Sequence, residues 1–177
     1  RSFNIWSAAN KMFKYSIFET ALGFMGAVSS PRGLHMVILP KSSEKAVKKT
    51  LEEHYCEDLI RDERLLSSVS RQIKDYLDGK RRSFKLQFDA RGATPFELKV
   101  WDTINGIPYG EVRSYDWVAK QIASPGMVRA VGQALKRNRL PLVFPCHRVI
   151  SKSGGLGGFS GGIPLKRKLL KIEGRIW

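Results

Sequence analysis

A cysteine and a histidine interrupt the apolar stretch LVFPCHRVI at residues 142–150. A buried strand has no need of His147 or Arg148, whereas a reactive thiol needs a neighbour that can accept its proton. A free thiol with a pKa near 8.5 is only about 3% ionised at pH 7; lowering that pKa by about 1.5 units, roughly 2 kcal/mol, leaves it about half ionised. Cys146 and His147 therefore indicate a cysteine nucleophile beside its base.

The histidine in turn needs a carboxylate to orient it, and the second half of the chain has few. Glu173, near the end of the last predicted helix, is the candidate. Cysteine and histidine are also metal ligands, but these residues show no CxxC or HxxxH spacing, and we predict no metal site. The residues considered are His35, His54, Cys56, Cys146 and His147. Cys56 is interpreted as a small buried residue or an exposed bystander, and two cysteines predict a reducing compartment.

Positive charge is concentrated in the half that holds Cys146. The chain has 31 Lys and Arg against 16 Asp and Glu, a net charge of +15. Residues 1–90 carry 16 basic and 11 acidic residues, and residues 91–177 carry 15 and 5. A polyanion, and nucleic acid in particular, is the expected partner; solubility alone is the other interpretation. No apolar run approaches the roughly 18–20 residues that span a bilayer, so we expect a soluble cytoplasmic protein.

The first half of the sequence predicts a small α+β layer, assigned to residues 1–89. Residues 12–39 read as strands with a hairpin turn at 29–33. Apolar residues at helical spacing predict helices around residues 47–55 and 66–77, the second ending near Gly79. The alternating segment SFKLQF at 83–88 predicts one more strand.

The second half, residues 90–177, changes to a helical and basic pattern. Thr94 opens a capping box with Glu97 and a proline between them, and an apolar stripe with Trp101 follows. Ser114 is predicted to cap a helix that ends near Ile122, and SPG at 124–126 turns into another helix at about 127–137. This spacing is typical of a helix-turn-helix.

Two faces are predicted for helix 127–137. Val128, Val131 and Leu135 face inward. Long polar side chains interleaved with small ones face outward and suit close contact with DNA, although a solvated basic face on a bundle helix gives the same pattern. The outward residues are Arg129, Ala130, Gly132, Gln133, Ala134, Lys136 and Arg137.

A glycine-rich loop, SKSGGLGGFSGG at 151–162, follows the cysteine. It has no GK[ST] continuation and does not fit a phosphate-binding fingerprint. A last helix is predicted to begin near Pro164 and to end at Gly174, burying Leu165, Leu169 and Ile172.

PCHRV at 145–149 resembles the signature of the O6-alkylguanine-DNA alkyltransferases, also called methylated-DNA–protein-cysteine methyltransferases, which move an alkyl group from guanine to their own cysteine. Segments 94–119, 129–138 and 157–174 are similar, in one register, to that family's domain opening, recognition helix, and active-site loop with closing helix. The resemblance implies a helix-turn-helix, winged-helix-like catalytic domain. Residues 1–89 resemble the family's RNase-H-like N-terminal domain only in the order of their elements.

The resemblance also implies roles in binding DNA. Arg129 enters the base stack where the target guanine is flipped out, and the small residues let the helix approach the minor groove. The implied DNA-binding residues are Ser114, Arg129, Ala130, Gly132, Gln133, Lys136 and Arg137.

For the chemistry, the resemblance implies that the Cys146 thiolate attacks the alkyl carbon, with His147 and Glu173 as its base system and Asn138 tying the recognition helix to the cysteine segment. Tyr115 donates to a ring nitrogen of the leaving guanine, and the carbonyls of Cys146 and Val149 accept from its exocyclic amine. The Ser160 N–H holds O6. The implied pocket residues are Leu135, Val149, Leu156, Phe159 and Ser160. The thioether stays, so each molecule reacts once.

This family implies no cofactor, a monomer, and duplex DNA containing O6-alkylguanine as partner, in the nucleoid of a prokaryote or the nucleus of a eukaryote. Two positions depart from its pattern: Arg139 stands where a proline is usual, and Phe159 where tyrosine is frequent. Three other interpretations remain: a lesion-binding relative without transfer, which usually lacks the cysteine; a dimeric transcription regulator; and a thiol hydrolase, which turns over.

Overall fold

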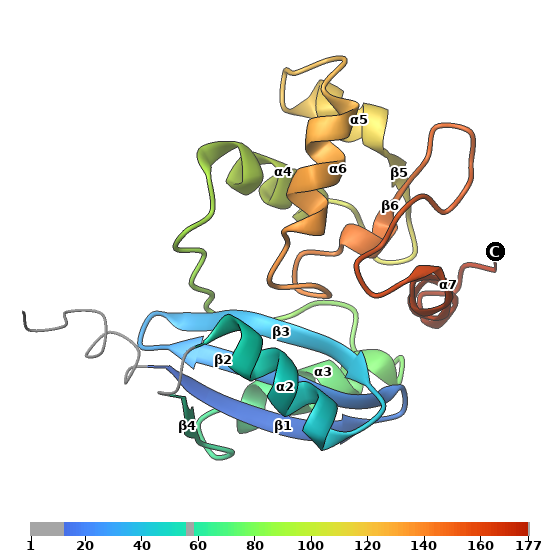
Figure 1. The fold of residues 1–177 in the computed structure, drawn as a ribbon. Coiled ribbons are helices and arrows are strands. Elements are labelled where there is room, and N and C mark those ends of the chain that lie inside the picture. Colours follow the sequence, from blue (N-terminus) through green and yellow to red (C-terminus); the bar gives the residue numbers. More distant parts are fainter. Residues whose placement is uncertain (1–12, 56–58, 177) are drawn as a thin grey trace, which may run out of the picture. The chain divides into compact units, whose positions relative to one another are not determined.

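The computed structural model describes residues 13–55 and 59–176, so Cys56 lies outside the described residues. The chain divides into two compact units between Asp89 and Ala90. The first unit combines a sheet with helices, and the second is mainly helical. Figure 1 colours the first from blue to green and the second from green to red.

The first unit is a four-stranded sheet with two helices. The strands are β1 (Lys14–Thr20), β2 (Gly23–Ser30), β3 (Gly33–Lys41) and β4 (Ile60–Arg61), in the order β3-β2-β1-β4. β2 is antiparallel to both of its neighbours, and β4 is parallel to β1. The helices are α2 (Glu44–His54) and α3 (Ser67–Leu77), which Figure 1 shows in front of the sheet and behind it.

The predicted hairpin and helices of this unit are confirmed. β2 is buried from Met25 to Ser30, as expected for a strand covered on both faces. Val47 and Leu51 of α2 pack into a cluster with strand residues that include Ile17 and Val28.

The strand predicted at residues 83–88 is wrong. Only an isolated bridge pairs Leu34 with Phe88. The side chain of Gln72 instead accepts from the Lys85 N–H at 2.9 Å and donates to the Lys85 carbonyl at 3.2 Å. Because these backbone groups are already satisfied by a helix side chain, they are not available to a neighbouring strand.

The second unit is built around three packed helices: α4 (Pro95–Asn105), α5 (Tyr115–Gln121) and α6 (Val128–Lys136). Both predicted helix starts are confirmed. The Thr94 hydroxyl accepts from the Glu97 N–H while the Glu97 carboxylate accepts from the Thr94 N–H, and Ser114 caps α5 by accepting from Trp117. α7 (Ile163–Ile172) closes the unit.

The cysteine segment is a short 3₁₀ turn, η1 (Cys146–Arg148), and not the end of a long strand. Only β6 (Val149–Ile150) is extended, and it pairs in parallel with β5 (Arg113–Ser114), just before α5. Prolines at 141 and 145 cannot donate to a sheet ladder, which explains why the apolar run does not form one strand. The β5–β6 pair places the start of α5 beside the cysteine turn.

α6 is turned differently from the prediction at two positions. Val128, expected inside, is 36% exposed, and Ala134, expected outside, is 2% exposed. Trp101 of α4 explains the second difference, because its indole N–H donates to the Ala134 carbonyl at 2.9 Å and so draws this face of α6 onto α4. Val131 and Leu135 are buried as predicted.

Candidate active site

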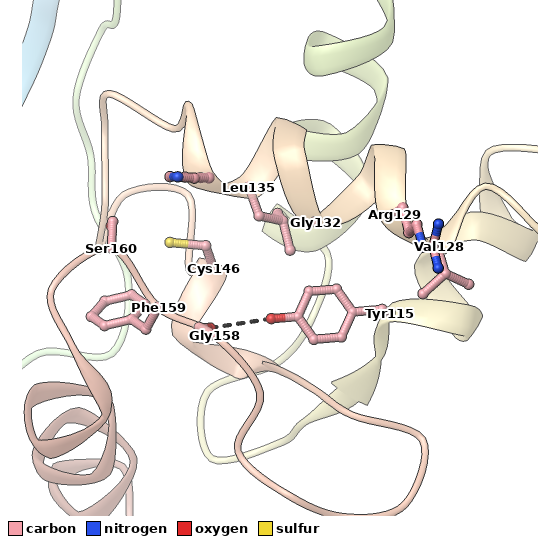
Figure 2. A pocket seen from close by; sticks show the side chains of 10 residues that line it. Tyr115, Val128, Arg129, Gly132, Leu135, Cys146, Gly158, Phe159 and Ser160 are labelled. Atoms are coloured by element: carbon pink, nitrogen blue, oxygen red, sulfur yellow. Dashed lines mark hydrogen bonds between the residues drawn. The ribbon is translucent and has the colours of Figure 1, made fainter.

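A pocket of about 500 Å³ opens beside the cysteine. Figure 2 shows Cys146 between Tyr115 of α5, Leu135 and Gly132 of α6, and Phe159 of the loop that precedes α7. Its lining residues are Tyr115, Val128, Arg129, Gly132, Leu135, Lys136, Cys146, Gly158, Phe159 and Ser160. Four segments, α5, α6, η1 and the loop before α7, therefore share one cavity.

The Cys146 side chain lines this pocket although the residue is only 4% exposed. Burial raises the pKa of the thiol, while a hydrogen bond from the Asn138 side chain and the charge of Lys166 lower it without reversing the shift. This net direction is the opposite of the lowering expected from the sequence. The thiol therefore holds its proton at neutral pH, and a base has to take that proton before the sulfur can attack.

His147 and Glu173 form a buried pair that can supply this base. Nε2 of His147 lies 2.8 Å from Oε1 of Glu173, and both side chains are fully buried. Burial lowers the pKa of His147 even though Glu173 raises it, so the imidazole is neutral at neutral pH. With Nε2–H donating to the carboxylate, Nδ1 has the lone pair that accepts a proton.

Arg148 holds the same carboxylate and was not assigned a role from the sequence. Its guanidinium donates to Glu173 at 2.9 to 3.1 Å and to the Ile107 carbonyl at 2.6 Å. The Gly110 N–H donates to Glu173 Oε2 at 3.0 Å. Gly110 has a φ of +78°, and a Cβ there would lie 2.9 Å from the Glu173 carbonyl oxygen, so this close approach requires glycine.

Asn138 links the end of α6 to the cysteine segment. Its amide donates to the Phe144 carbonyl at 2.9 Å, and its side-chain oxygen accepts from the Leu140 N–H at 3.0 Å. The neighbouring Arg139 donates to the Arg91 carbonyl. Both residues thus fix the chain that leads to Cys146.

Tyr115 lies across the pocket from Cys146, and its hydroxyl donates to the Gly158 carbonyl at 3.1 Å (Figure 2). Burial and the nearby Cys146 thiolate charge raise the pKa of this phenol, so it is a proton donor. Gly157 has a φ of +67°, and a Cβ there would lie 2.9 Å from the Tyr115 ring. The loop can approach the tyrosine this closely only because residue 157 is glycine.

Lys166 is a buried cation that was not predicted from the sequence. It lies on α7 with 0% of its surface exposed, and its ammonium donates to the carbonyls of Val149 and Leu156, both at 2.5 Å, and of Gly158 at 3.3 Å. Burial lowers its pKa to about 8, opposed by the charge of Cys146. Lys166 therefore ties β6 and the pocket loop to α7, and its charge acts on the sulfur.

Replacing Lys166 with methionine is expected to slow labelling of Cys146 by iodoacetamide about tenfold at pH 7, because losing the nearby cation raises the pKa of the thiol and lowers its thiolate fraction. Above about pH 8 the rates of the variant and the native protein should converge, since Lys166 itself becomes neutral there. Lys168→Met, at an exposed position on the same helix, is the control. Equal labelling of both variants at pH 7 would remove the electrostatic role.

The predicted DNA-binding residues are grouped on α6 and near it. Arg129 and Lys136 line the pocket, with Arg129 exposed and drawn at the end of the cavity away from Ser160 (Figure 2). Gln133 is exposed, and Ala130 and Gly132 are half-buried. Two residues have partners: Arg137 lies 3.2 Å from Glu97, and the Ser114 hydroxyl caps α5.

Of the predicted pocket residues, Leu135, Phe159 and Ser160 line the cavity. Val149 and Leu156 are buried and do not appear in the lining of this cavity, and their carbonyls accept from Lys166.

The described residues contain no group of three or more His, Cys, Asp or Glu side chains placed to hold a metal ion. Over those same residues, no helix combines the length and apolarity needed to cross a membrane.

Cys146 lies in a pocket that is also lined by cationic residues of α6, and the next residue, His147, forms a buried pair with Glu173. This arrangement is that of a protein with a thiol nucleophile. Residues 95–175 match the family model described as 6-O-methylguanine DNA methyltransferase, DNA binding domain. The methylated-DNA–protein-cysteine methyltransferase of Methanosarcina acetivorans is 37% identical over 160 residues, which are 90% of this chain and 97% of that protein. The constitutive enzyme of Bacillus subtilis is 48% identical over 109 residues, 61% of this chain and 66% of its own.

Solved structures agree with these relatives. The Mycobacterium tuberculosis OGT in complex with DNA has a TM-score of 0.77 at 34% identity, covering 90% of this chain and 92% of that one. The O6-methylguanine-DNA methyltransferase from Pyrococcus kodakaraensis has a TM-score of 0.68 at 28% identity, covering 93% and 100%. This chain belongs to the methylated-DNA–protein-cysteine methyltransferase family, whose members transfer a methyl group to a cysteine of their own.

Proposed function

We propose that this protein repairs DNA by direct reversal, taking O6-alkylguanine out of the duplex and moving its alkyl group to Cys146. The observation that carries the proposal is the shared cavity: the Cys146 side chain and the exposed Arg129 of α6 line one pocket of about 500 Å³. A flipped nucleobase needs such a cavity next to the helix that enters the groove.

Flipping the guanine costs a few kcal/mol of stacking and pairing. Arg129 offsets part of that cost by placing its planar guanidinium in the vacated stack. Gly132 and Ala130 let the backbone of α6 approach the minor groove, and Gln133, Lys136, Arg137 and Ser114 supply contacts to the DNA backbone.

In the pocket, the Ser160 N–H holds O6, and the carbonyls of Cys146 and Val149 accept from the exocyclic amine. Val149 can do so while it also accepts from Lys166, because a carbonyl oxygen has two lone pairs. Leu135 and Phe159 provide the apolar wall. Guanine has an amino group at this position of the ring and adenine does not, so these carbonyls select guanine.

The reaction begins when Nδ1 of His147, directly or through one water, takes the thiol proton, with Glu173 stabilising the imidazolium. The Cys146 sulfur attacks the alkyl carbon in line, the S–C bond forms, and the C–O6 bond breaks. Tyr115 donates a proton to the leaving base and regains it from the base system, so the net proton transfer is from the thiol to guanine. The product is a thioether.

We further propose that residues 1–89 form an RNase-H-like domain and residues 90–177 a winged-helix-like catalytic domain. The sheet with helices on both faces supports the first assignment, and the packed α4, α5 and α6 with the β5–β6 pair support the second. The protein acts as a monomer on duplex DNA in the cytoplasm, nucleoid or nucleus, wherever the genome lies.

The amount of guanine restored in O6-methylguanine duplex should plateau at one per protein molecule, because a thioether has no downstream nucleophile to release it. The plateau is measured by varying the ratio of DNA to protein over long incubations. Continued release beyond one equivalent would indicate a thiol hydrolase instead.

Arg129→Ala is expected to slow repair of a duplex lesion about 100-fold. This corresponds to a loss of roughly 3 kcal/mol in the stabilisation of the flipped-out base. Reaction with free O6-benzylguanine, which needs no flipping, should change less than twofold. Lys99→Ala, an exposed cation on α4, is the control. Equal losses on duplex and free base would mean that Arg129 supports the pocket itself.

A further inference from the structure

α7 has one face that the proposed function leaves unused. Leu169 and Leu170 are buried against the unit, and Lys166 reaches into it. Arg167, Lys168 and Lys171 are exposed; we refer to these three as the α7 cationic face. Their spacing of i, i+1 and i+4 puts them along one stripe of the helix.

This stripe has no acidic counterpart among the residues that the structure describes. Four of the five acidic residues of the second unit, Glu97, Glu111, Asp116 and Glu173, form ion pairs with other cations, and the fifth, Asp102, lies on α4. None of the ion pairs found in the described chain includes a residue of the α7 cationic face. Three neighbouring like charges without a partner repel one another, and an external polyanion relieves that repulsion.

The α7 cationic face is also fixed to the pocket. Ser160, a lining residue, lies three positions before α7, and Lys166 binds the carbonyls of Val149, Leu156 and Gly158 from within the helix. The α7 cationic face runs from Arg167 to Lys171, about 6 Å along the helix, and duplex DNA carries one charge per roughly 1.7 Å of its axis. A stripe on this helix can therefore meet several phosphates once a base occupies the pocket.

We infer that the α7 cationic face binds the phosphate backbone of the duplex under repair, outside the stretch that α6 contacts. The inference rests on the proposed function for its choice of duplex DNA as partner. It adds a second contact surface that holds the flank of the duplex while α6 enters the groove.

The test measures the salt dependence of binding to unmodified 40-base-pair DNA. The triple variant Arg167→Ala, Lys168→Ala, Lys171→Ala should reduce the slope of log K against log salt by about 2 to 3, since each neutralised phosphate contributes about 0.9. The matched control removes the same charge from exposed positions of α2, as Lys45→Ala, Lys48→Ala, Lys49→Ala, and should change the slope by less than about one.

An unchanged slope in the α7 variant, or equal reductions in the two triple variants, would overturn the inference. A complex in which one protein holds two duplexes, detected by sedimentation at excess DNA, would overturn the assignment to the same duplex. Reaction with free O6-benzylguanine, which involves no phosphate, shows that the variant is folded. Because the salt series uses undamaged DNA, a failure of alkyl transfer would remove the proposed function and still leave the slopes interpretable.

Discussion

Cys146→Ser should slow alkyl transfer at least roughly 10⁴-fold, the loss typical of removing the nucleophile from a group of catalytic residues that act together. A serine hydroxyl is a far weaker acid than a thiol. A base that can deprotonate the buried thiol therefore cannot deprotonate the serine hydroxyl. Single-turnover transfer from O6-methylguanine duplex measures the loss.

DNA binding is the internal control for this variant. Cys146 lines the pocket and is only 4% exposed, so replacing its sulfur by oxygen leaves the surface of α6 unchanged. Affinity for undamaged duplex should stay within about twofold, a change of less than 0.5 kcal/mol. Retained transfer in the serine variant would show that another group is the acceptor.

Glu173→Gln should both destabilise the protein and slow the reaction. The substitution keeps the shape of the side chain but leaves the buried Arg148 guanidinium without its anion, which costs about 3–5 kcal/mol of unfolding free energy. It also removes the negative charge that stabilises protonated His147, so transfer should fall by about 10²- to 10⁴-fold.

The double variant Glu173→Gln, Arg148→Met separates the two effects. Removing the guanidinium as well takes away the unpaired charge, and stability measured by urea unfolding should recover by a few kcal/mol. The transfer rate should not recover, because His147 still lacks its carboxylate. Glu111→Gln, which breaks an exposed pair with Arg113, should cost less than about 1 kcal/mol. Recovery of rate together with stability would assign Glu173 a purely structural role.

Local signals in the sequence predicted much of the second unit. The Thr94 capping box and the Ser114 cap depend on neighbours within three residues, and both helix starts are where those residues place them. The proximity of His147 to Glu173, 26 residues apart, was expected from the family resemblance and from chemistry.

What the sequence could not predict depends on contacts between distant segments. Ala134 is buried, against the prediction, because Trp101 of α4 binds its carbonyl, and periodicity within α6 alone contains no information on that partner. Residues 83–88 alternate like a strand, yet Gln72 takes the backbone groups of Lys85.

Lys166 illustrates the limit most clearly. Its neighbours Arg167 and Lys168 are exposed, and a run of three basic residues reads as one solvated face. A cation can be buried here only because three carbonyls from β6 and the glycine-rich loop converge on it. The available signal was the position of Lys166 three residues before Leu169, which puts it on the apolar side of the helix.

The most direct test is peptide mass spectrometry after incubation with O6-methylguanine duplex. A sulfur that attacks carbon and keeps it should add the mass of a single methyl group to the peptide spanning residue 146, in step with the guanine regained. Methyl mass found on Cys56, or unmodified protein alongside repaired DNA, would contradict the account.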